Sequence, residues 1–179
     1  MSYTAPSVNV LSYPSVFVSP YSKEGNGPFS IGATPASAVY PSANRAYYYS
    51  IVIPRALVIR RFWWLNGATV GTNNLQAGLY YDSFVSVLLG ASTLSAGTAN
   101  LVQFDDVADT AIGPGEYWLA LWCDGTTATI FRLATTGGPR HGVIYDEDSL
   151  TGGLPTTATP TSPANVYLPM FGFTTRASP

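Results

Sequence analysis

The feature that most constrains the fold is a series of short segments in which side chains alternate between two faces, separated by turn sequences. LVIRRFWWL (57–65) divides into one set, Leu57, Ile59, Arg61, Trp63 and Leu65, and a second, Val58, Arg60, Phe62 and Trp64. GPGEYWLALWCDG (113–125) sets Tyr117, Leu119, Leu121 and Cys123 against Trp118, Ala120 and Trp122. Such segments, about 8–15 residues apart with turn residues between them, predict an antiparallel sandwich or barrel.

Residues 1–44 follow a different pattern, which proline dominates. The prolines recur along the whole segment: Pro6, Pro14, Pro20, Pro28, Pro35 and Pro41. This spacing forbids helix and keeps the chain extended, whereas the apolar residues between the prolines are not those of a flexible linker. We therefore predict an extended N-terminal arm whose rings anchor it in grooves: Tyr3, Tyr13, Phe17 and Tyr21.

The remaining chain, 45–179, is predicted to form a single β-sandwich domain. TGGLPTTATPTSPAN (151–165) predicts a long surface loop, and VYLPMFGF (166–173) a last strand that Pro169 places at an edge or beside a bulge. No window shows a sustained 3.6-residue period with caps. The expected fold is therefore all-β: an antiparallel jelly-roll-like sandwich with an extended arm and almost no helix.

Composition restricts the partners of this domain. Charged residues make up 10% of the chain, against roughly 25% in a typical soluble domain. The surface is then either neutral and soluble or buried against other subunits. The net charge of −2 without a basic block argues against nucleic acid, and no apolar stretch is long enough to predict a membrane span. The N-terminus does not resemble a secretory signal, so we expect synthesis in a cytoplasm, where the protein stays or which it leaves by a route other than secretion, such as lysis.

Residues for catalysis or metal binding are scarce. His141 is the only histidine and Cys123 the only cysteine, so zinc and a Ser-His-Asp triad are not expected. Two acidic clusters remain: Asp105, Asp106 and Asp109, and Asp146, Glu147 and Asp148. Solvated loop charges are the simplest interpretation, with a Ca²⁺ site or a catalytic carboxylate pair as alternatives. We predict no enzyme activity, no cofactor and no metal.

Aromatic residues are the strongest functional signal, above all in RAYYYSIVIPRALVIRRFWWLNG (45–67). Consecutive strand residues point to opposite faces, so Trp63 and Trp64 cannot both enter one core. One is left for a loop, the arm, a partner or a sugar, and Arg60 and Arg61 can stack on the rings or pair with carboxylates. We interpret the stretch as a central strand covered on both faces, with these four residues at an interface.

Three strings together resemble β-sandwich virion proteins of tailed bacteriophages: YPSANRAYYYSIVIPRALVIRRFWWLNG, NLQAGLYYD and VQFDDVADTAIGPGEYWLAL. The resemblance covers about residues 38–135 and is one of pattern and composition. It implies an oligomeric structural protein of the head-decoration or tail-fibre type, made in the host cytoplasm, located in the virion and released by lysis. It implies no catalytic residues.

Three functions are therefore weighed. The first is a non-enzymatic capsid decoration or head-associated protein that assembles, with a trimer favoured, with itself and with other capsid or tail proteins through its arm and aromatic strands. The second is a tail-fibre or receptor-binding module that stacks a host-surface glycan on an exposed Trp or Tyr. The third is a glycosidase that uses the acidic clusters.

Overall fold

The computed structural model describes residues 15–16, 36–133, 144–161 and 168–176. Within these ranges the chain is all-β, as predicted, and contains no helix. The strands are β1 (Ser15–Val16), β2 (Ala36–Val39), β3 (Arg45–Ile53), β4 (Leu57–Leu65), β5 (Asn74–Tyr81), β6 (Ser86–Leu89), β7 (Thr93–Leu94), β8 (Val102–Ile112), β9 (Gly115–Cys123), β10 (Thr129–Leu133), β11 (Ile144–Glu147), β12 (Leu168–Pro169) and β13 (Phe171–Arg176).

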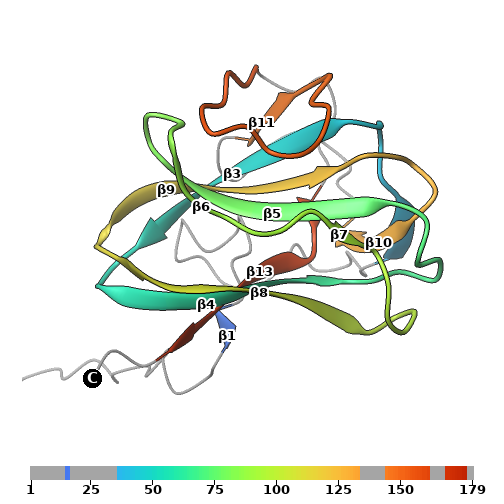
Figure 1. The fold of residues 1–179 in the computed structure, drawn as a ribbon, viewed down its shortest axis with the longest axis horizontal. Coiled ribbons are helices and arrows are strands. Elements are labelled where there is room, and N and C mark those ends of the chain that lie inside the picture. The colour runs from blue at the N-terminus through green and yellow to red at the C-terminus, as the bar shows by residue number, and fades with distance from the viewer. Residues whose placement is uncertain (1–14, 17–35, 134–143, 162–167, 177–179) are drawn as a thin grey trace, which may run out of the picture.

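Two antiparallel sheets face each other across the core (Figure 1). The larger has the order β11-β3-β9-β5-β6, with β7 also paired to β5, and the smaller has the order β1-β13-β4-β8. The stretch expected to be one central strand thus forms two, β3 and β4, one in each sheet. Pro54 lies between them, where the chain crosses from one sheet to the other.

The connections wind strand pairs around the core. β3 and β4 are consecutive but lie in opposite sheets, and the same is true of β8 and β9. Because β3 pairs with β9 and β4 pairs with β8, the two pairs wind together. This connectivity is typical of Greek-key and jelly-roll sandwiches.

A third, three-stranded sheet has the order β12-β10-β2. Its β12 ends at Pro169, and the chain then passes through Met170 into β13 of the smaller sheet. The predicted last strand is therefore split in two, with Pro169 on an edge strand, where its missing N–H removes no ladder hydrogen bond. Residues 36–44, which the sequence assigned to the arm, contribute β2 and the fully buried Tyr40 to the domain.

The main core lies between the two large sheets, and β9 shows how the sequence produces it. Its alternation follows the prediction: Tyr117, Leu119, Leu121 and Cys123 enter this core. Trp118, Ala120 and Trp122 lie on the opposite face of the larger sheet, where they belong to a second apolar cluster. The strand is nonpolar on both faces because both are covered, as in other buried strands.

The segment at 150–158 covers that second cluster. Leu154 and Ala158 are 7% and 5% exposed and pack against Trp118 and Trp122. Trp122 donates its indole N–H to the carbonyl of Leu150 at 2.9 Å. Within the loop that the sequence predicted at 151–165, Leu154 and Ala158 thus cover a second core, while residues 162–165 lie outside the described residues.

The alternation in β4 reverses part-way along the strand, which corrects the predicted faces. Relative to β13, the register passes from Ile59 opposite Thr175 to Arg61 opposite Thr174, which leaves Arg60 as an extra residue. This β-bulge shifts the following side chains to the other face. Leu57 and Ile59 therefore share the core with Phe62 and Trp64, rather than with Arg61 and Trp63.

No helix in the described ranges has the length and apolarity needed to span a bilayer.

Candidate functional site

The predicted interface residues do not come together as one site. Tyr3, Tyr13, Phe17 and Tyr21 lie outside the described residues. The four residues of β4 are distributed by the bulge.

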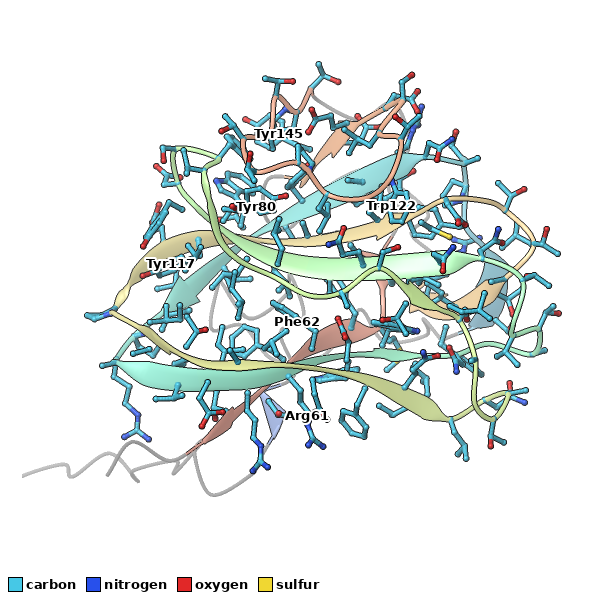
Figure 2. The ribbon with its side chains drawn as sticks, in the orientation of Figure 1. Arg61, Phe62, Tyr80, Tyr117, Trp122 and Tyr145 are labelled. Atoms are coloured by element: carbon cyan, nitrogen blue, oxygen red, sulfur yellow. The ribbon has the colours of Figure 1, made fainter. Side chains whose placement is uncertain are left out.

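Trp64 is fully buried in the core, and Arg60 is exposed at the bulge itself. Trp63, 7% exposed, and Arg61 belong to the outer face of the smaller sheet. Figure 2 shows this division, with Phe62 directed between the sheets and Arg61 directed away from them.

Arg61 joins β4 to β8 on this outer face. Its Nε lies 2.7 Å from Oδ1 of Asp106, the residue directly opposite in the register. Its guanidinium carbon lies 5.2 Å from the ring centroid of Phe104, close enough for a cation–π contact. Asp106 is 74% exposed, so the ion pair contributes little to stability. Its effect is to fix Arg61 beside an exposed ring.

The beginning of β8 and the residue before it carry apolar side chains on the outside, a feature that sequence reasoning missed. Val102 and Phe104 are 44% and 48% exposed, and adjoining Leu101 is 57% exposed. The alternate residues Gln103 and Asp105 face the interior instead. An ordinary half-buried strand has the opposite arrangement. Leu101, Val102 and Phe104 are called the β8 strip below.

Gln103 and Asp105 hold the chain that joins β6 to β8. The Gln103 side chain donates to the carbonyl of Leu94 at 2.9 Å and accepts from the amide of Ala96 at 2.8 Å. These two bonds occupy the polar ends of the side chain. The inward polar residues of β8 therefore have structural partners, and the outward apolar residues of the strip do not fill the core.

Asp105 is the least well accommodated of these groups. It is 6% exposed, and its Oδ2 has no hydrogen-bond partner among the described residues. It lies so close to Gly90 that a side chain at that position would collide with it. Burial raises the pKa of Asp105, and the charge of Asp106 also raises it, while hydrogen bonds from the Ala91 amide and the Thr93 side chain lower it.

Rings gather on the outer face of the larger sheet, under the segment that follows β11 (Figure 2). Tyr48 and Tyr80 meet edge to face with centroids 5.4 Å apart. Tyr48 donates to Glu147 at 2.8 Å and Tyr80 to the carbonyl of Pro155 at 2.6 Å. Desolvation raises the pKa of both hydroxyls. Both rings therefore serve to attach this segment to the sheet.

Phe84 closes the same cluster from the turn between β5 and β6. Its ring stacks on Trp118 with centroids 5.0 Å apart and planes 22° apart, and it meets Tyr48 and Tyr145 edge-on at 5.9 Å. Its φ of 61° is rare for a bulky residue. The strain of about 1–3 kcal/mol is offset by these ring contacts, each worth about 0.5–1.5 kcal/mol.

Exposure of the aromatic residues bears on the glycan alternative. All four tryptophans are nearly or fully buried, with Trp63 and Trp118 the most exposed at 7%. A sugar-stacking platform needs an open ring face, which none of them offers. Tyr81, 50% exposed, is the tyrosine with the most open surface among the described residues.

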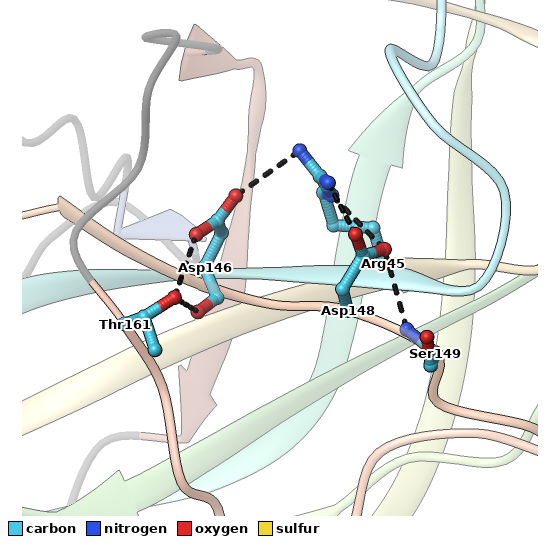
Figure 3. A network of polar contacts seen from close by, with 5 residues as sticks. All are labelled: Arg45, Asp146, Asp148, Ser149 and Thr161. Carbon is cyan, nitrogen blue, oxygen red and sulfur yellow. Dashed lines mark hydrogen bonds and ion pairs between the residues drawn. The ribbon is translucent and has the colours of Figure 1, made fainter.

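The second acidic cluster is a clamp rather than a convergent site (Figure 3). Arg45 pairs with Asp146 at 3.2 Å and makes two contacts with Asp148. Its guanidinium lowers the pKa of Asp148. Thr161 pairs with Asp146 through the backbone in both directions, at 2.8 and 2.7 Å. Arg45 thereby ties β3 to both ends of the segment from 146 to 161.

Neither acidic cluster brings the carboxylates of all its members to one point among the described residues. Glu147 points away from Arg45 and accepts from Tyr48 and Thr159. Asp105 and Asp106 likewise face opposite sides of β8. In the part of the chain that the structure describes, no group of three or more His, Cys, Asp or Glu residues could hold a metal ion. His141 lies outside that part, and burial raises the pKa of the Cys123 thiol to about 12.

Comparison of this chain with family models, curated proteins and solved structures found no match. Its function is therefore argued from its own residues.

Proposed function

We propose that the chain is a non-enzymatic structural subunit of a tailed-bacteriophage virion, of the capsid-decoration or head-associated type. The observation that carries this proposal is the inverted pattern of β8. Leu101, Val102 and Phe104 are exposed while Gln103 and Asp105 face inward. An apolar strip on a weakly charged surface is typical of a protein that is covered by a partner.

The partner surface is the outer face of the smaller sheet. Phe104 lies opposite Trp63 in the register, and Val102 lies opposite Leu65. Arg61 and Asp106 continue this face as an ion pair. An apolar centre with a charged margin is the usual anatomy of a protein interface. The partners in this proposal are capsid or tail proteins and further copies of the chain.

The proposal includes the lack of an enzyme activity. It is supported by the contacts that the carboxylates of the second acidic cluster make. Asp146 and Asp148 are paired with Arg45, and Glu147 binds Tyr48. A general acid or base needs a free carboxyl beside a space for substrate. These carboxylates instead fasten the segment that covers the second core.

The test is whether the β8 strip is needed for particle association. Phe104→Asp should reduce the protein that cosediments with gradient-purified particles by at least tenfold, because a buried contact is replaced by a charge. Val52→Asp is the matched control, since Val52 is equally exposed at 48% but lies on β3 of the other sheet. Equal cosedimentation of both variants with wild type would refute a role for the strip.

A second candidate, a receptor-binding module for host-surface glycans, is favoured by one observation only. Tyr81 is 50% exposed, with its ring centroid 5.9 Å from that of Tyr117. An open tyrosine can stack on a sugar ring. Tyr81→Ala should then abolish retention on immobilised host-surface glycans, and no retention of the wild-type protein would eliminate this candidate.

A further inference from the structure

The edge of the smaller sheet shows where the N-terminal arm makes contact. Among the described residues, β13 pairs with β4 through six residue pairs on one side and with β1 through two on the other. Those two pairs are Ser15 opposite Thr174 and Val16 opposite Phe173. Figure 1 shows β1 beside β13, at the margin of the sandwich. The β13 edge therefore accepts a strand from the N-terminal part of the chain.

The pairing of β1 with β13 does not depend on which copy supplies the strand. Each backbone hydrogen bond of such a pairing is worth about 0.5–1.5 kcal/mol net, and the same bonds form whether Ser15 and Val16 come from the same copy or from a neighbour. The β13 strand itself is fixed in the domain, since Phe171 and Phe173 are each 1% exposed in the core. The accepting edge is therefore a permanent part of the fold, present in every copy.

The length of chain behind β1 allows the strand to reach another molecule. β1 ends at Val16 and β2 begins at Ala36, so twenty Cα–Cα steps separate these two residues. A chain of that length spans at most about 70 Å when extended. A small domain is about 30 Å across, so the β13 edge of an adjacent copy lies within reach.

We propose that copies of this chain exchange β1, so that the β13 edge of one copy binds Ser15 and Val16 of its neighbour. The exchanged pairing keeps the register of the internal one, because the β13 edge that sets the register is the same in every copy. Passed in one direction around a closed ring, such contacts fill every edge and leave no strand unpaired. This inference rests on the proposed function, since it names the partner of the arm in the assembly as a second copy of the chain.

Concentration decides between the exchanged and the internal pairing. A strand tethered to its own domain competes at an effective concentration in the millimolar range. Exchange is therefore rare in dilute solution and becomes common when copies are held together, as on a particle. The pairing of β1 with the β13 edge of a neighbour then forms after the copies have assembled, and it stabilises the assembly.

Two cysteine variants test this directly. One protein carries Ser15→Cys and the other Thr174→Cys, residues that lie directly opposite each other in the pairing. Opposed strand residues have Cβ atoms about 4.5–5.5 Å apart, within about 1 Å of the spacing in a disulfide. The two are mixed under mild oxidation at protein concentrations from about 10 µM to about 1 mM. The buried Cys123 remains in place, and wild type must give no cross-link.

Exchange predicts a disulfide-linked dimer of the two variants, with a yield that rises at least tenfold over this range. The matched control mixes the Ser15→Cys protein with Ala111→Cys, an exposed position on β8 at the other edge of the sheet. A chain carrying both Ser15→Cys and Thr174→Cys should cross-link internally in dilute solution. That result shows that cysteines at these positions can pair.

Three results would overturn the proposal. The first is internal cross-linking of the double variant with no dimer from the mixture at about 1 mM. The second is an equal dimer yield from the Ala111→Cys control, which would show that the contact is not specific to β13. The third is no cross-link in either sample, which would contradict the pairing itself. If particles still bind the protein after any of these, only the exchange fails and the proposed function stands.

Discussion

Replacing Asp105 by Asn should make the protein more stable at neutral pH, against the usual direction of mutations in a core. The carboxyl is 6% exposed and its Oδ2 has no hydrogen-bond partner among the described residues. A buried polar group left without a partner costs about 1–3 kcal/mol. Asn keeps one oxygen to accept from Ala91 and Thr93 and puts a neutral NH₂ group in the place of Oδ2, and a neutral amide costs less to bury than a carboxylate. We expect a gain of about 1–2 kcal/mol at pH 7, or roughly 2–8 °C in Tm.

The stability difference between Asp105→Asn and wild type should depend on pH, and the raised pKa of Asp105 gives the direction. Because the pKa of Asp105 is raised in the folded protein, folding favours its protonated form. The stability that this proton contributes is fully present below the unfolded pKa of about 3.9, and it is lost as the pH rises through the folded pKa. The advantage of Asp105→Asn should therefore be large at pH 7 and vanish at about pH 3.5.

Urea unfolding followed by tryptophan fluorescence measures both values. Asp106→Asn is the matched control, since Asp106 is the next residue and is 74% exposed beside Arg61. It should change the free energy of unfolding by less than about 0.5 kcal/mol at either pH. An Asp105→Asn protein that is less stable than wild type at pH 7 would refute the reasoning, because the carboxylate would then be well solvated or paired.

Three further predictions concern the cover of the second core, the clamp and the arm. Leu154→Ala should cost about 2–3 kcal/mol in urea unfolding, since Leu154 is 7% exposed against Trp122; a loss under 0.5 kcal/mol would show that the segment is not packed. Arg45→Met should lower stability at pH 7 and less so below about pH 4, because the pKa of Asp148 is lowered by Arg45 and its stabilisation is lost as the pH falls; a pH-independent loss would contradict this. Deleting residues 1–28 should leave a domain with a cooperative unfolding transition that no longer assembles, and normal incorporation of the truncated protein into particles would contradict the role of the arm.

Alternation along the sequence predicted the sheets well where a strand is covered on both faces. In β9, Leu119 and Trp122 lie on the faces expected from spacing alone. The same rule fails in β4, because the extra residue Arg60 moves Phe62 to the face of Ile59. A one-residue bulge leaves no compositional mark, and it becomes visible only in the pairing of β4 with β13 and β8.

The candidate site was harder to predict for a related reason. The simplest interpretation of Asp105 was a solvated charge, yet the structure buries Asp105 and exposes the neighbouring Phe104. This arrangement depends on tertiary contacts, above all the backbone groups at Ala91 and Leu94 that receive the inward polar side chains. The composition of 151–165 likewise gave no sign that this segment covers the second core, since Leu154 is its only large aliphatic side chain before Val166.

The most direct test of the central claim, that this chain is a virion subunit, is immunogold electron microscopy of particles from the producing culture, with an antibody against the protein. Gold over the head is the predicted result and would identify a decoration or head-associated protein. Gold at the tail or its tip would instead favour the second candidate, a tail-fibre or receptor-binding module for host-surface glycans. Particles without any gold would contradict the virion assignment itself.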